Sequence, residues 1–378
     1  MNEILFKDFI KLQRGFDLPK TQMIEGDYPV IGSITIIGYH NEYKVDPPGV
    51  ITGRSGSLGF VQYIKKKYWP HNTSLWVKDF KGNQPKYVYY FLKVFGLERF
   101  NSGAGVPTLN RNDLDNYEIQ IHEIETQQKI ASILSVYDDL IENNTRRIKI
   151  LEEMAQTIYK EWFVNFRFPG YEKVRFVKSP LGKIPEGWEV KKIGEICKVG
   201  RGSSPRPIAD KKYFEGGNIP WIKIADATAS GKFLYQTKEK VNEYGASFSR
   251  IMDKGSLIVA TSGTLGFCLF LGVKGCIHDG WLYMSDYKDV SPSFLYFVLN
   301  ANREAFNNQS YGAAIQNINT DILRNTMFVL PVKELLEKFV QFVDIIDREI
   351  NNLSRKNINL RKTRDLLLPK LMSGEVEV

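Results

Sequence analysis

The stretch Gly53-Arg54-Ser55-Gly56-Ser57-Leu58-Gly59-Phe60 returns 207 residues later as Ala260-Thr261-Ser262-Gly263-Thr264-Leu265-Gly266-Phe267. The same offset relates three further pairs of identical residues: His71 and His278, Asp79 and Asp286, and Pro85 and Pro292. After a slippage of two residues the match continues, with Asn110 opposite Asn319 and Leu114 opposite Leu323. A repeat of this length indicates a duplicated domain rather than a short solenoid unit. A chain with two similar modules can read two similar sites at a fixed separation.

The composition fits a folded protein with two modest domains. The chain has 378 residues, of which 43% are hydrophobic, so each half can bury a core of its own. The formal net charge of +8 favours an anionic partner such as nucleic acid. The cysteines are Cys197, Cys268 and Cys276, an odd number without a CxxC pair, which argues against a disulfide framework. No signal peptide or membrane-spanning run is visible, and we expect a cytoplasmic protein.

Each repeat is predicted to begin with short strands and to end in a long helix. Residues 28–38, 256–260 and 267–272 read as strands, closely punctuated by glycine and proline. Short helices are expected at 87–95 and 294–300, each opened by a nearby proline.

Heptad repeats predict the two long helices. A residue recurs every seventh position in each copy: Ile130, Tyr137, Asn144, Leu151 and Ile158, then Phe339, Ile346, Leu353, Leu360 and Leu367. The d positions of the first copy are assigned to Ile133, Leu140 and Met154, with Leu134, Ile141 and Ile148 widening the stripe. Heptads sustained over some 40 residues predict a coiled coil roughly 60 Å long. Polar Asn144 and Asn357 could fix its register.

The predicted fold is α+β, with two similar globular β-rich domains separated by two long antiparallel coiled-coil helices in a pseudo-two-fold internal repeat. Phe166-Arg167-Phe168-Pro169-Gly170 should stop the first helix, and Leu368-Pro369-Lys370-Leu371-Met372-Ser373-Gly374 should stop the second. The predicted boundaries in chain order are 1–121 for the first globe, 122–168 for the central helix, 169–187 for a linker, 188–331 for the second globe and 332–378 for the C-terminal helix and tail.

No catalytic or metal-binding motif is complete in this sequence. Asp46-Pro47-Pro48-Gly49 has glycine where the amino-methyltransferase motif needs an aromatic residue, so a tight loop is predicted. Gly200-Arg201-Gly202-Ser203-Ser204-Pro205 has proline in place of the third glycine of a dinucleotide-binding loop and is interpreted as a turn with an exposed arginine. The four histidines form no metal-ligand pattern, and His71 and His278 are expected to pack or hydrogen-bond in each copy.

Basic, hydroxyl and amide side chains on predicted loops are candidates for nucleic-acid contact. Arginine can bind guanine through two hydrogen bonds, lysine neutralises phosphate, and asparagine or glutamine can read adenine. The candidates are Arg14, Arg54, Ser55, Ser57, Lys65, Lys66, Lys67, Asn110, Arg111, Arg201, Ser203, Arg206, Lys211, Lys212, Thr261, Ser262, Thr264, Gln316 and Asn317.

Several stretches resemble the specificity subunit of Type I restriction-modification systems. The sharpest are residues 151–170, from Leu151-Glu152-Glu153-Met154 to Phe168-Pro169-Gly170, and the linker Gly182-Lys183-Ile184-Pro185-Glu186-Gly187-Trp188. Residues 124–134, the loop 54–59 and the tail 367–374 also match, so the resemblance covers essentially the whole chain.

The resemblance implies a non-catalytic DNA reader. Each globe would be a target recognition domain for one half of a split, asymmetric sequence in double-stranded DNA. The helices would set the spacer and dock two methyltransferase subunits, and restriction subunits would join through the complex. The methyl donor, ATP and Mg²⁺ would then be bound by those partners, with no cofactor or metal in this chain.

Other readings remain open at this point. An orphan specificity subunit could serve a modification-only enzyme, and a coiled-coil scaffold could bind proteins alone. A methyltransferase–nuclease fused to a recognition domain would need a catalytic region that this chain is too short to hold. Alone, the subunit could self-associate through its wide helical stripe. The half-sites depend on loop geometry as well as on residue type, so one sequence does not reveal them.

Overall fold

The computed structural model describes residues 1–228, 230–261, 265–309 and 318–378. The chain divides into two compact units. The first unit comprises Met1–Asn144 and Lys356–Val378, and the second comprises Thr145–Arg355. Each long helix therefore contributes one segment to each unit, and the two units are described separately below.

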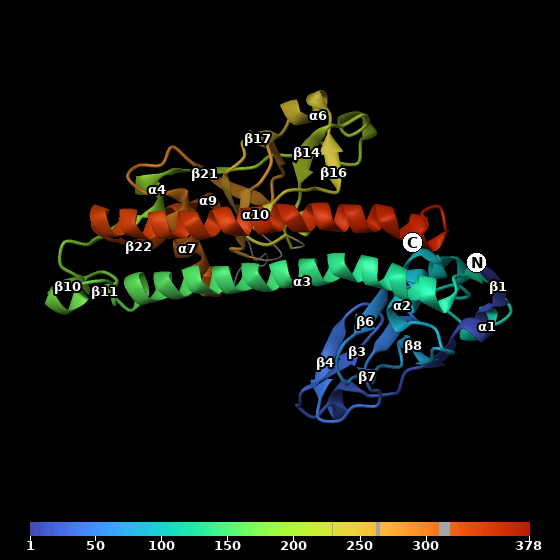
Figure 1. Cartoon of the computed structure of the whole chain (residues 1–378). Helices are drawn as coiled ribbons and strands as arrows, with labels where there is room; N and C mark the ends of the chain where they lie inside the picture. Colours follow the sequence, from blue (N-terminus) through green and yellow to red (C-terminus); the bar gives the residue numbers. More distant parts are fainter. Residues whose placement is uncertain (229, 262–264, 310–317) are drawn as a thin grey trace. The chain divides into compact units, whose positions relative to one another are not determined.

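The first unit contains three small sheets and short helices (Figure 1). Its outer pair is antiparallel: β1 (Asn2–Leu5) and β9 (Glu118–Ile121). A four-stranded sheet follows the order β2 (Lys11–Arg14), β8 (Ser74–Asp79), β5 (Gly49–Gly53) and β6 (Val61–Ile64). A three-stranded sheet follows the order β4 (Ile36–His40), β3 (Tyr28–Ile31) and β7 (Trp69–Pro70), with β3 and β7 parallel. The helical elements are α1 (Phe6–Phe9), η1 (Lys20–Gln22), α2 (Pro85–Val94), η2 (Leu97–Phe100) and η3 (Arg111–Asp113).

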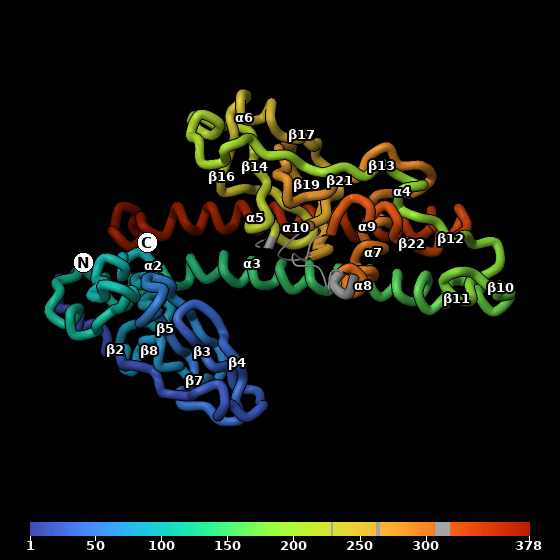
Figure 2. Tube along the Cα trace, turned by 180° about the vertical axis from the view of Figure 1, so that it is seen from behind, coloured from blue at the N-terminus to red at the C-terminus, as the bar shows by residue number. Residues whose placement is uncertain are grey.

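The second unit repeats the strand arrangement of the first unit and adds further strands and helices; Figure 2 shows the backbone trace. β12 (Glu189–Lys192) pairs with β22 (Met327–Leu330). A five-stranded sheet has the order β13 (Lys198–Arg201), β21 (Trp281–Ser285), β18 (Leu257–Ala260), β19 (Cys268–Leu271) and β15 (Phe233–Leu234). A four-stranded sheet has the order β16 (Glu239–Val241), β14 (Ile219–Ile222), β20 (Gly275–Ile277) and β17 (Arg250–Met252).

Short helices and a hairpin complete the second unit. The helices are η5 (Tyr171–Lys173), α4 (Ile193–Ile196), η6 (Lys211–Tyr213), α5 (Ile224–Thr228), α6 (Glu243–Ser247), α7 (Pro292–Ala301), α8 (Arg303–Gln309) and α9 (Thr320–Asn325). The hairpin consists of β10 (Phe176–Ser179) and β11 (Gly182–Pro185).

The duplication predicted from the sequence is confirmed by the topology. The order β2-β8-β5-β6 in the first unit matches β13-β21-β18-β19 in the second, and the parallel pair β3–β7 matches β14–β20. The predicted short helices are α2 and α7, and each has proline within its first two positions. Proline suits this place because its fixed φ fits the helix and its missing N–H would have no partner there.

The predicted long helices are α3 (Ile124–Tyr159), which continues as a π-helical turn, η4 (Lys160–Val164), and α10 (Lys333–Met372). In the first unit their segments run antiparallel, because Asp138 contacts Arg364 while Asn144 contacts Asn357. Asn144 Nδ2 donates to Asn357 Oδ1 at 2.9 Å, and both residues are buried. A buried amide pair favours one register, since any slip would leave both amides unpaired.

The C-terminal helix ends inside the predicted stretch, residues 368–374. α10 runs to Met372 with Pro369 inside its last turn, and Gly374 follows at a φ of 76°. A proline lacks only its own N–H and clashes only with the preceding turn. The last turn can therefore close behind it, and Ser373 N donates to the Pro369 carbonyl at 2.9 Å.

The helical seam also differs in part from the prediction. The a positions Ile130 and Phe339 are buried, but Ile133, Leu140 and Met154 are between 36% and 46% exposed. The inward positions follow each a residue by four instead of three, as with Leu134 and Val343. The same shift occurs in both copies, which places the predicted d residues on the outer surface of the helices.

Each unit has its own apolar core, and a segment of each long helix belongs to it. In the first unit, Phe6, Phe9 and Tyr87 pack with Ile130 of α3 and Leu371 of α10. In the second unit, the aromatic centre contains Tyr159, Phe163, Phe294, Phe297 and Phe339. Full burial of each such side chain contributes about 1.5–3 kcal/mol, which holds the helices firmly to the sheets. No helix within the described ranges is long and apolar enough to cross a membrane.

Candidate nucleic-acid interface

A basic groove opens on the first unit beside the end of β2. Two sequence candidates, Arg14 and Arg111, line it together. The structure adds four lysines that sequence reasoning missed: Lys7, Lys11, Lys78 and Lys81. Three carboxylates also line it: Asp8, Asp17 and Asp115. With six cations against three anions, the groove attracts a polyanion.

Strand pairing assembles this groove from distant parts of the chain. In the register of β2 with β8, Lys11 lies opposite Asp79, so Lys78 and Lys81 come near Lys11 and Arg14. Arg111 is held from the other side, where its Nη1 donates to the Leu12 carbonyl at 3.4 Å. No local sequence pattern marks these four lysines as part of a site. They could be found only by knowing the register in which β2 pairs with β8.

A carboxylate clamps Arg14 at the edge of the groove. Arg14 Nη1 and Nη2 donate to Asp17 Oδ2 and Oδ1 at 3.1 and 2.7 Å. Asn72 Nδ2 also donates to Asp17 Oδ1. The hydrogen bond from Asn72, followed by that from Arg14, lowers the pKa of the Asp17 carboxyl, so the ion pair persists in mildly acidic solution.

The second unit places a similar cluster at the equivalent strand end. Arg201 Nε donates to the Asp279 carbonyl at 2.6 Å, and Ser204 Oγ donates to Asp279 Oδ1 at 2.9 Å. Arg206 Nη2 donates to the other carboxylate oxygen of Asp279. Burial raises the pKa of Asp279, but the hydrogen bond from Ser204 and the positive charge of Arg206 outweigh it, and the net shift is downward. The predicted exposed turn therefore begins in a strand, and its arginines are both held.

One glycine in each unit makes this strand end possible. Gly15 follows Arg14 and Gly202 follows Arg201, and a Cβ at either position would collide with the carbonyl of His71 or His278 behind it. The backbone N–H of Gly15 donates to the Ser74 carbonyl at 3.0 Å, and that of Gly202 donates to the Trp281 carbonyl at 2.8 Å. The Arg-Gly pair therefore brings its strand against the loop that carries Asn72 or Asp279.

The lysine run of the first unit is largely engaged within its own unit. Lys65 Nζ lies 2.6 Å from Glu142 Oε2 and 3.3 Å from Asp139 Oδ1, both on α3. The bond to Glu142 is the main cause of the raised pKa of Lys65. Lys67 donates to the Tyr43 hydroxyl at 2.8 Å, whereas Lys66 is exposed. Of the three, Lys66 alone has no ion pair among the described contacts.

The remaining candidates of the first unit lie close to Asn72 or cap a turn. Arg54 Nη1 donates to the Asn72 carbonyl at 3.3 Å, which adds a second guanidinium to the Arg14 cluster. Ser55 bridges to Thr108, and Ser57 is exposed. Asn110 caps η3 by accepting from Asn112 N, which gives it a structural task.

The remaining candidates of the second unit divide into exposed and buried ones. Ser203 is exposed, and Lys211 and Lys212 lie on η6, where Lys212 pairs with Asp210 at 2.9 Å. Thr261 is only 2% exposed and its hydroxyl donates to the Gly280 carbonyl at 3.0 Å, so it supports the fold and does not face a ligand. Ser262, Thr264, Gln316 and Asn317 lie outside the described residues.

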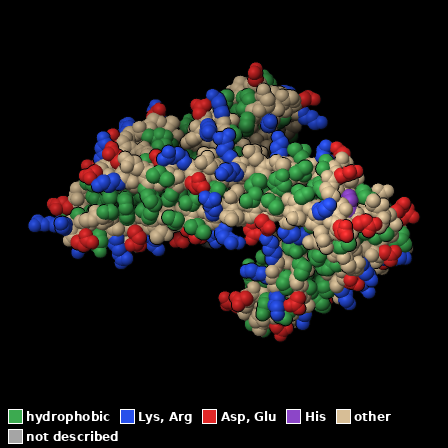
Figure 3. All heavy atoms as spheres, viewed as in Figure 1, with side chains coloured by type: hydrophobic (Ala, Val, Ile, Leu, Met, Phe, Trp, Pro, Cys, Tyr) green, Lys and Arg blue, Asp and Glu red, His purple; other side chains and the backbone are tan. Residues whose placement is uncertain are grey.

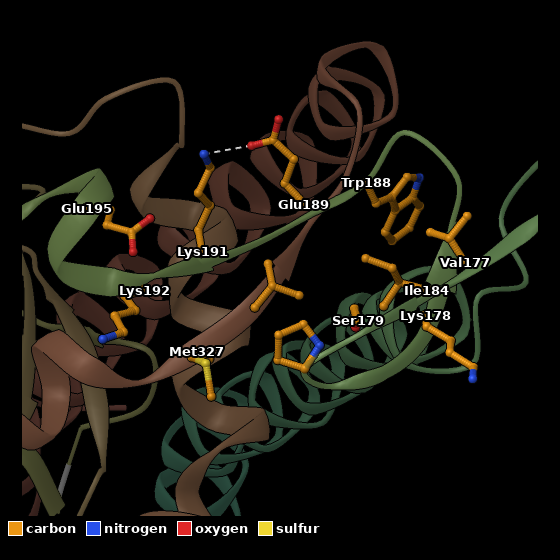
Figure 4. A pocket seen from close by; sticks show the side chains of 12 residues that line it. Val177, Lys178, Ser179, Ile184, Trp188, Glu189, Lys191, Lys192, Glu195 and Met327 are labelled. Atoms are coloured by element: carbon orange, nitrogen blue, oxygen red, sulfur yellow. Dashed lines mark ion pairs between the residues drawn. The ribbon is translucent and has the colours of Figure 1, made fainter.

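A second hollow lies beside the hairpin of the second unit (Figure 4). Trp188, Ile184 and Met327 line it, together with Lys191 and Lys192. Lys191 Nζ is 2.7 Å from Glu189 Oε2, and Lys192 Nζ donates to Asn325 Oδ1 at 3.2 Å. Three lysines and two glutamates line the hollow, so its excess of positive charge is smaller than that of the groove in the first unit.

The repeat-mate histidines serve the fold, as predicted. His71 Nδ1 lies 3.0 Å from Thr73 Oγ1, and His278 Nδ1 lies 2.6 Å from Gly280 N. Burial is the main cause of the lowered pKa of both imidazoles. The folded protein therefore prefers them neutral.

The stability of the fold should consequently fall in mild acid. A folded-state pKa below the usual 6.5 means that the unfolded chain binds more protons once the pH drops below that value. Stability present at pH 7.5 is then lost as the pH falls toward 5.5. We expect the thermal midpoint to decrease over this range and His278→Gln to flatten the decrease. Equal slopes for wild type and variant would contradict this assignment.

The described residues hold no metal cluster, and two buried cysteines are poor nucleophiles. No three histidine, cysteine, aspartate or glutamate side chains gather in metal-binding geometry there. Burial raises the pKa of Cys197 to about 11 and that of Cys268 to about 12, which makes both thiols poor nucleophiles. Asp46-Pro47-Pro48 is a loop before β5, Gly49 is the first residue of that strand, and a side chain at Gly49 would collide with Tyr68.

Known proteins share both the sequence pattern and the fold. The family model for the Type I restriction modification DNA specificity domain matches residues 3–153 and 185–360. The MjaIX specificity subunit of Methanocaldococcus jannaschii, from a Type I restriction enzyme, is 27% identical over 354 residues, which cover 89% of this chain and 79% of the relative. The HindI specificity subunit of Haemophilus influenzae is 25% identical over 331 residues, with 71% of each chain covered.

A solved structure extends the likeness to the fold. The crystal structure of a Type-I restriction-modification system S subunit from M. genitalium matches with a TM-score of 0.63 and 17% identity. The match covers 98% of this chain and 96% of that chain. At this identity the likeness concerns the fold alone, and it confirms the predicted α+β class with two β-rich domains and two long helices.

Proposed function

Because the chain belongs to the family of Type I restriction modification DNA specificity domains, we propose that each of its units reads one half of a split, asymmetric DNA sequence. One observation carries this proposal. The same topology occurs twice, and in both units arginine side chains gather at the same strand end, beside Asn72 or Asp279. The surrounding residues differ, which suits two different half-sites.

In this proposal lysines supply affinity for DNA and arginines supply sequence specificity. Lysines of the first-unit groove neutralise phosphates, which supplies affinity without reading sequence. The arginines at the strand ends carry forked donors that can reach base edges in the major groove. The base to be modified must leave the stack, and the partner that binds it supplies the methyl donor and performs the reaction. This chain positions the duplex and has no part in the bond-making step.

Equivalent apolar residues on the two helices fit two copies of one partner. Ile133 and Val136 of the first unit are 36% and 56% exposed. Their repeat mates Phe342 and Ile345 of the second unit are 37% and 61% exposed. Figure 3 shows hydrophobic side chains over the long helices on the face drawn. Exposed apolar residues at matching sites favour two identical docking surfaces, and we assign them to two methyltransferase subunits.

The helices also set the spacer between the half-sites. Both α3 and α10 contribute residues to each unit, so a change in helix length alters the separation of the two readers. Restriction subunits, with their ATP and Mg²⁺, would join through the methyltransferase subunits. An orphan assembly that only methylates DNA would use this chain in the same way.

Removing a groove lysine should weaken DNA binding without changing the motif. Lys78→Gln, on β8, should lower the slope of log affinity against log salt by about 0.9, the value for one lost phosphate contact. Lys20→Gln removes an exposed lysine of the same unit outside the groove and should leave the slope unchanged. Fluorescence anisotropy of the assembled complex at several salt concentrations measures both. Equal slopes for Lys78→Gln and wild type would contradict the phosphate role.

Selection from a random DNA pool tests the proposed function. The chain is assembled with its methyltransferase subunits, and retained duplexes are sequenced. We expect a two-part motif with an unspecified spacer of constant length. A stable complex that enriches no motif would overturn the proposal and leave the protein-binding scaffold as the better reading.

A further inference from the structure

A carboxylate-clamped arginine occurs in both units at the same place in the fold, but different chain positions supply it. In the first unit Asp17 clamps Arg14, and Asn72 supports the carboxylate. In the second unit Asp279 clamps Arg206, and Ser204 supports the carboxylate.

The carboxylate and its supporting partner have exchanged positions between the repeats. Asp17 and Ser204 each lie three residues after the equivalent arginines Arg14 and Arg201. Asn72 and Asp279 are equivalent by the offset of 207 residues. One aspartate is therefore kept in each cluster, at alternate positions, and each binds an exposed guanidinium. Arg14 and Arg206 have side chains that are 46% and 67% exposed.

The second clamp is also fixed through the main chain. The Tyr213 hydroxyl donates to the Arg206 carbonyl at 2.9 Å, and Tyr213 is only 4% exposed. Its ring stacks on Tyr244 with 5.5 Å between centroids. Backbone and side chain of Arg206 are thus both held before any ligand arrives, which reduces the conformational entropy lost on binding.

We propose that Arg14 and Arg206 each read a guanine, one in each half-site, with Asp17 and Asp279 as positioning residues. This inference rests on the proposed function and names the base that each clamp recognises.

The chemistry favours guanine over a phosphate as the ligand. An aspartate beside the guanidinium repels a phosphate but not a neutral base edge. Guanine presents O6 and N7 as paired acceptors in the major groove, which match the arginine fork. On Arg206 the clamp engages one N–H of Nη2 only, so an adjacent donor pair, Nη2 with either Nη1 or Nε, remains for a base. On Arg14 the clamp engages Nη1 and Nη2, which leaves Nε–H and the second N–H of Nη2 as the donor pair for a base.

Motif selection with single variants of the assembled complex tests the inference. Arg206→Ala should relax one guanine position in one half-site, with discrimination there falling by about 10- to 100-fold. Arg14→Ala should do the same in the other half-site. The untouched half-site of each variant is its own internal control. Lys274→Ala, which breaks an exposed pair with Asp253 in the second unit, should change neither half-site.

Conservative variants separate base reading from a role in folding. Arg206→Lys keeps the charge but loses the fork, so it should relax the same guanine position as Arg206→Ala. Asp279→Asn should reduce discrimination at that position without moving the spacer. An unchanged motif in both arginine variants, or a uniform loss of affinity for every sequence, would overturn the inference while leaving the proposed function intact. A wild-type complex without a split motif would overturn the proposed function itself.

Discussion

Replacing Lys232 by methionine should destabilise the second unit by about 3–5 kcal/mol, because it leaves a buried carboxylate without its partner. The Lys232 side chain is 2% exposed, and its Nζ lies 2.5 Å from Asp347 Oδ1 on α10. Tyr296 and Phe297 of α7 place their rings 4.4 and 4.9 Å from the ammonium. Burial lowers the pKa of Lys232 and raises that of Asp347, so each charge is maintained by the other.

Urea unfolding of the purified chain measures this effect. A double variant, Lys232→Met with Asp347→Leu, should recover most of the lost stability, since an apolar pair of similar volume is tolerated in place of a buried ion pair. Lys198→Met removes an exposed lysine that pairs with Asp286 and should leave the midpoint unchanged. If Lys232→Met costs no more than Lys198→Met, the buried pair has little part in holding α10 to the sheet.

The first unit has a related pair from different residues. Asp138 of α3 is the repeat mate of Asp347, at an offset of 209 residues. It accepts from Arg364 at 2.5 Å and from the Tyr90 hydroxyl at 2.6 Å. An aspartate at the same helix position thus binds a lysine from the globe in one unit and an arginine from the second helix in the other. The duplication preserved the carboxylate while its cation changed.

Lengthening both helices by one heptad should lengthen the DNA spacer and leave both half-sites unchanged. The insertions belong between Asn144 and Thr145 and between Arg355 and Lys356, where the two units meet in sequence. Each heptad adds roughly 10 Å of helix, about the rise of three base pairs. Seven residues preserve the inward positions of the seam, so the apolar stripe stays continuous. Motif selection with the assembled complex gives the spacer directly.

A single insertion is the control for the double one. A heptad in α3 alone should disturb the pairing with α10 and lower stability, with no new spacer of defined length. Changed half-sites in the double variant would contradict the role of the helices as a spacer, because readout would then depend on helix length.

Features that repeat along the chain were predictable from sequence. The duplicated loop predicted the internal repeat, and the heptads predicted the long helices α3 and α10. Asn144 and Asn357 were named as residues that could fix the register, whereas their hydrogen bond to each other is a finding of the structure. The inward position after each a residue was assigned to the edge of the stripe instead of the seam, since Ile133 and Leu134 are equally apolar and only packing separates them.

Features that depend on strand pairing were not predictable. Lys11, Lys78 and Arg111 meet in one groove because β2 pairs with β8, and no local pattern announces that register. Asp279, which clamps Arg206, is 73 positions away, and Asn72, which supports the Asp17 clamp, is 55 positions from Asp17. Lys65 was predicted to contact nucleic acid because it lies in a basic run, but in the structure it pairs with carboxylates of α3. A sequence shows where lysines and arginines lie along the chain, but not which carboxylates bind them in the fold.

Genome-wide methylation mapping tests the central claim most directly. A host lacking Type I systems would carry this chain together with a methyltransferase subunit gene from the same genome, and each gene alone would be the control. We predict methylation at a split motif of two defined half-sites with a constant spacer, present only when both genes are expressed. A soluble complex that leaves the genome unmethylated, or methylates a single undivided motif, would contradict the account of two DNA-reading units on one chain.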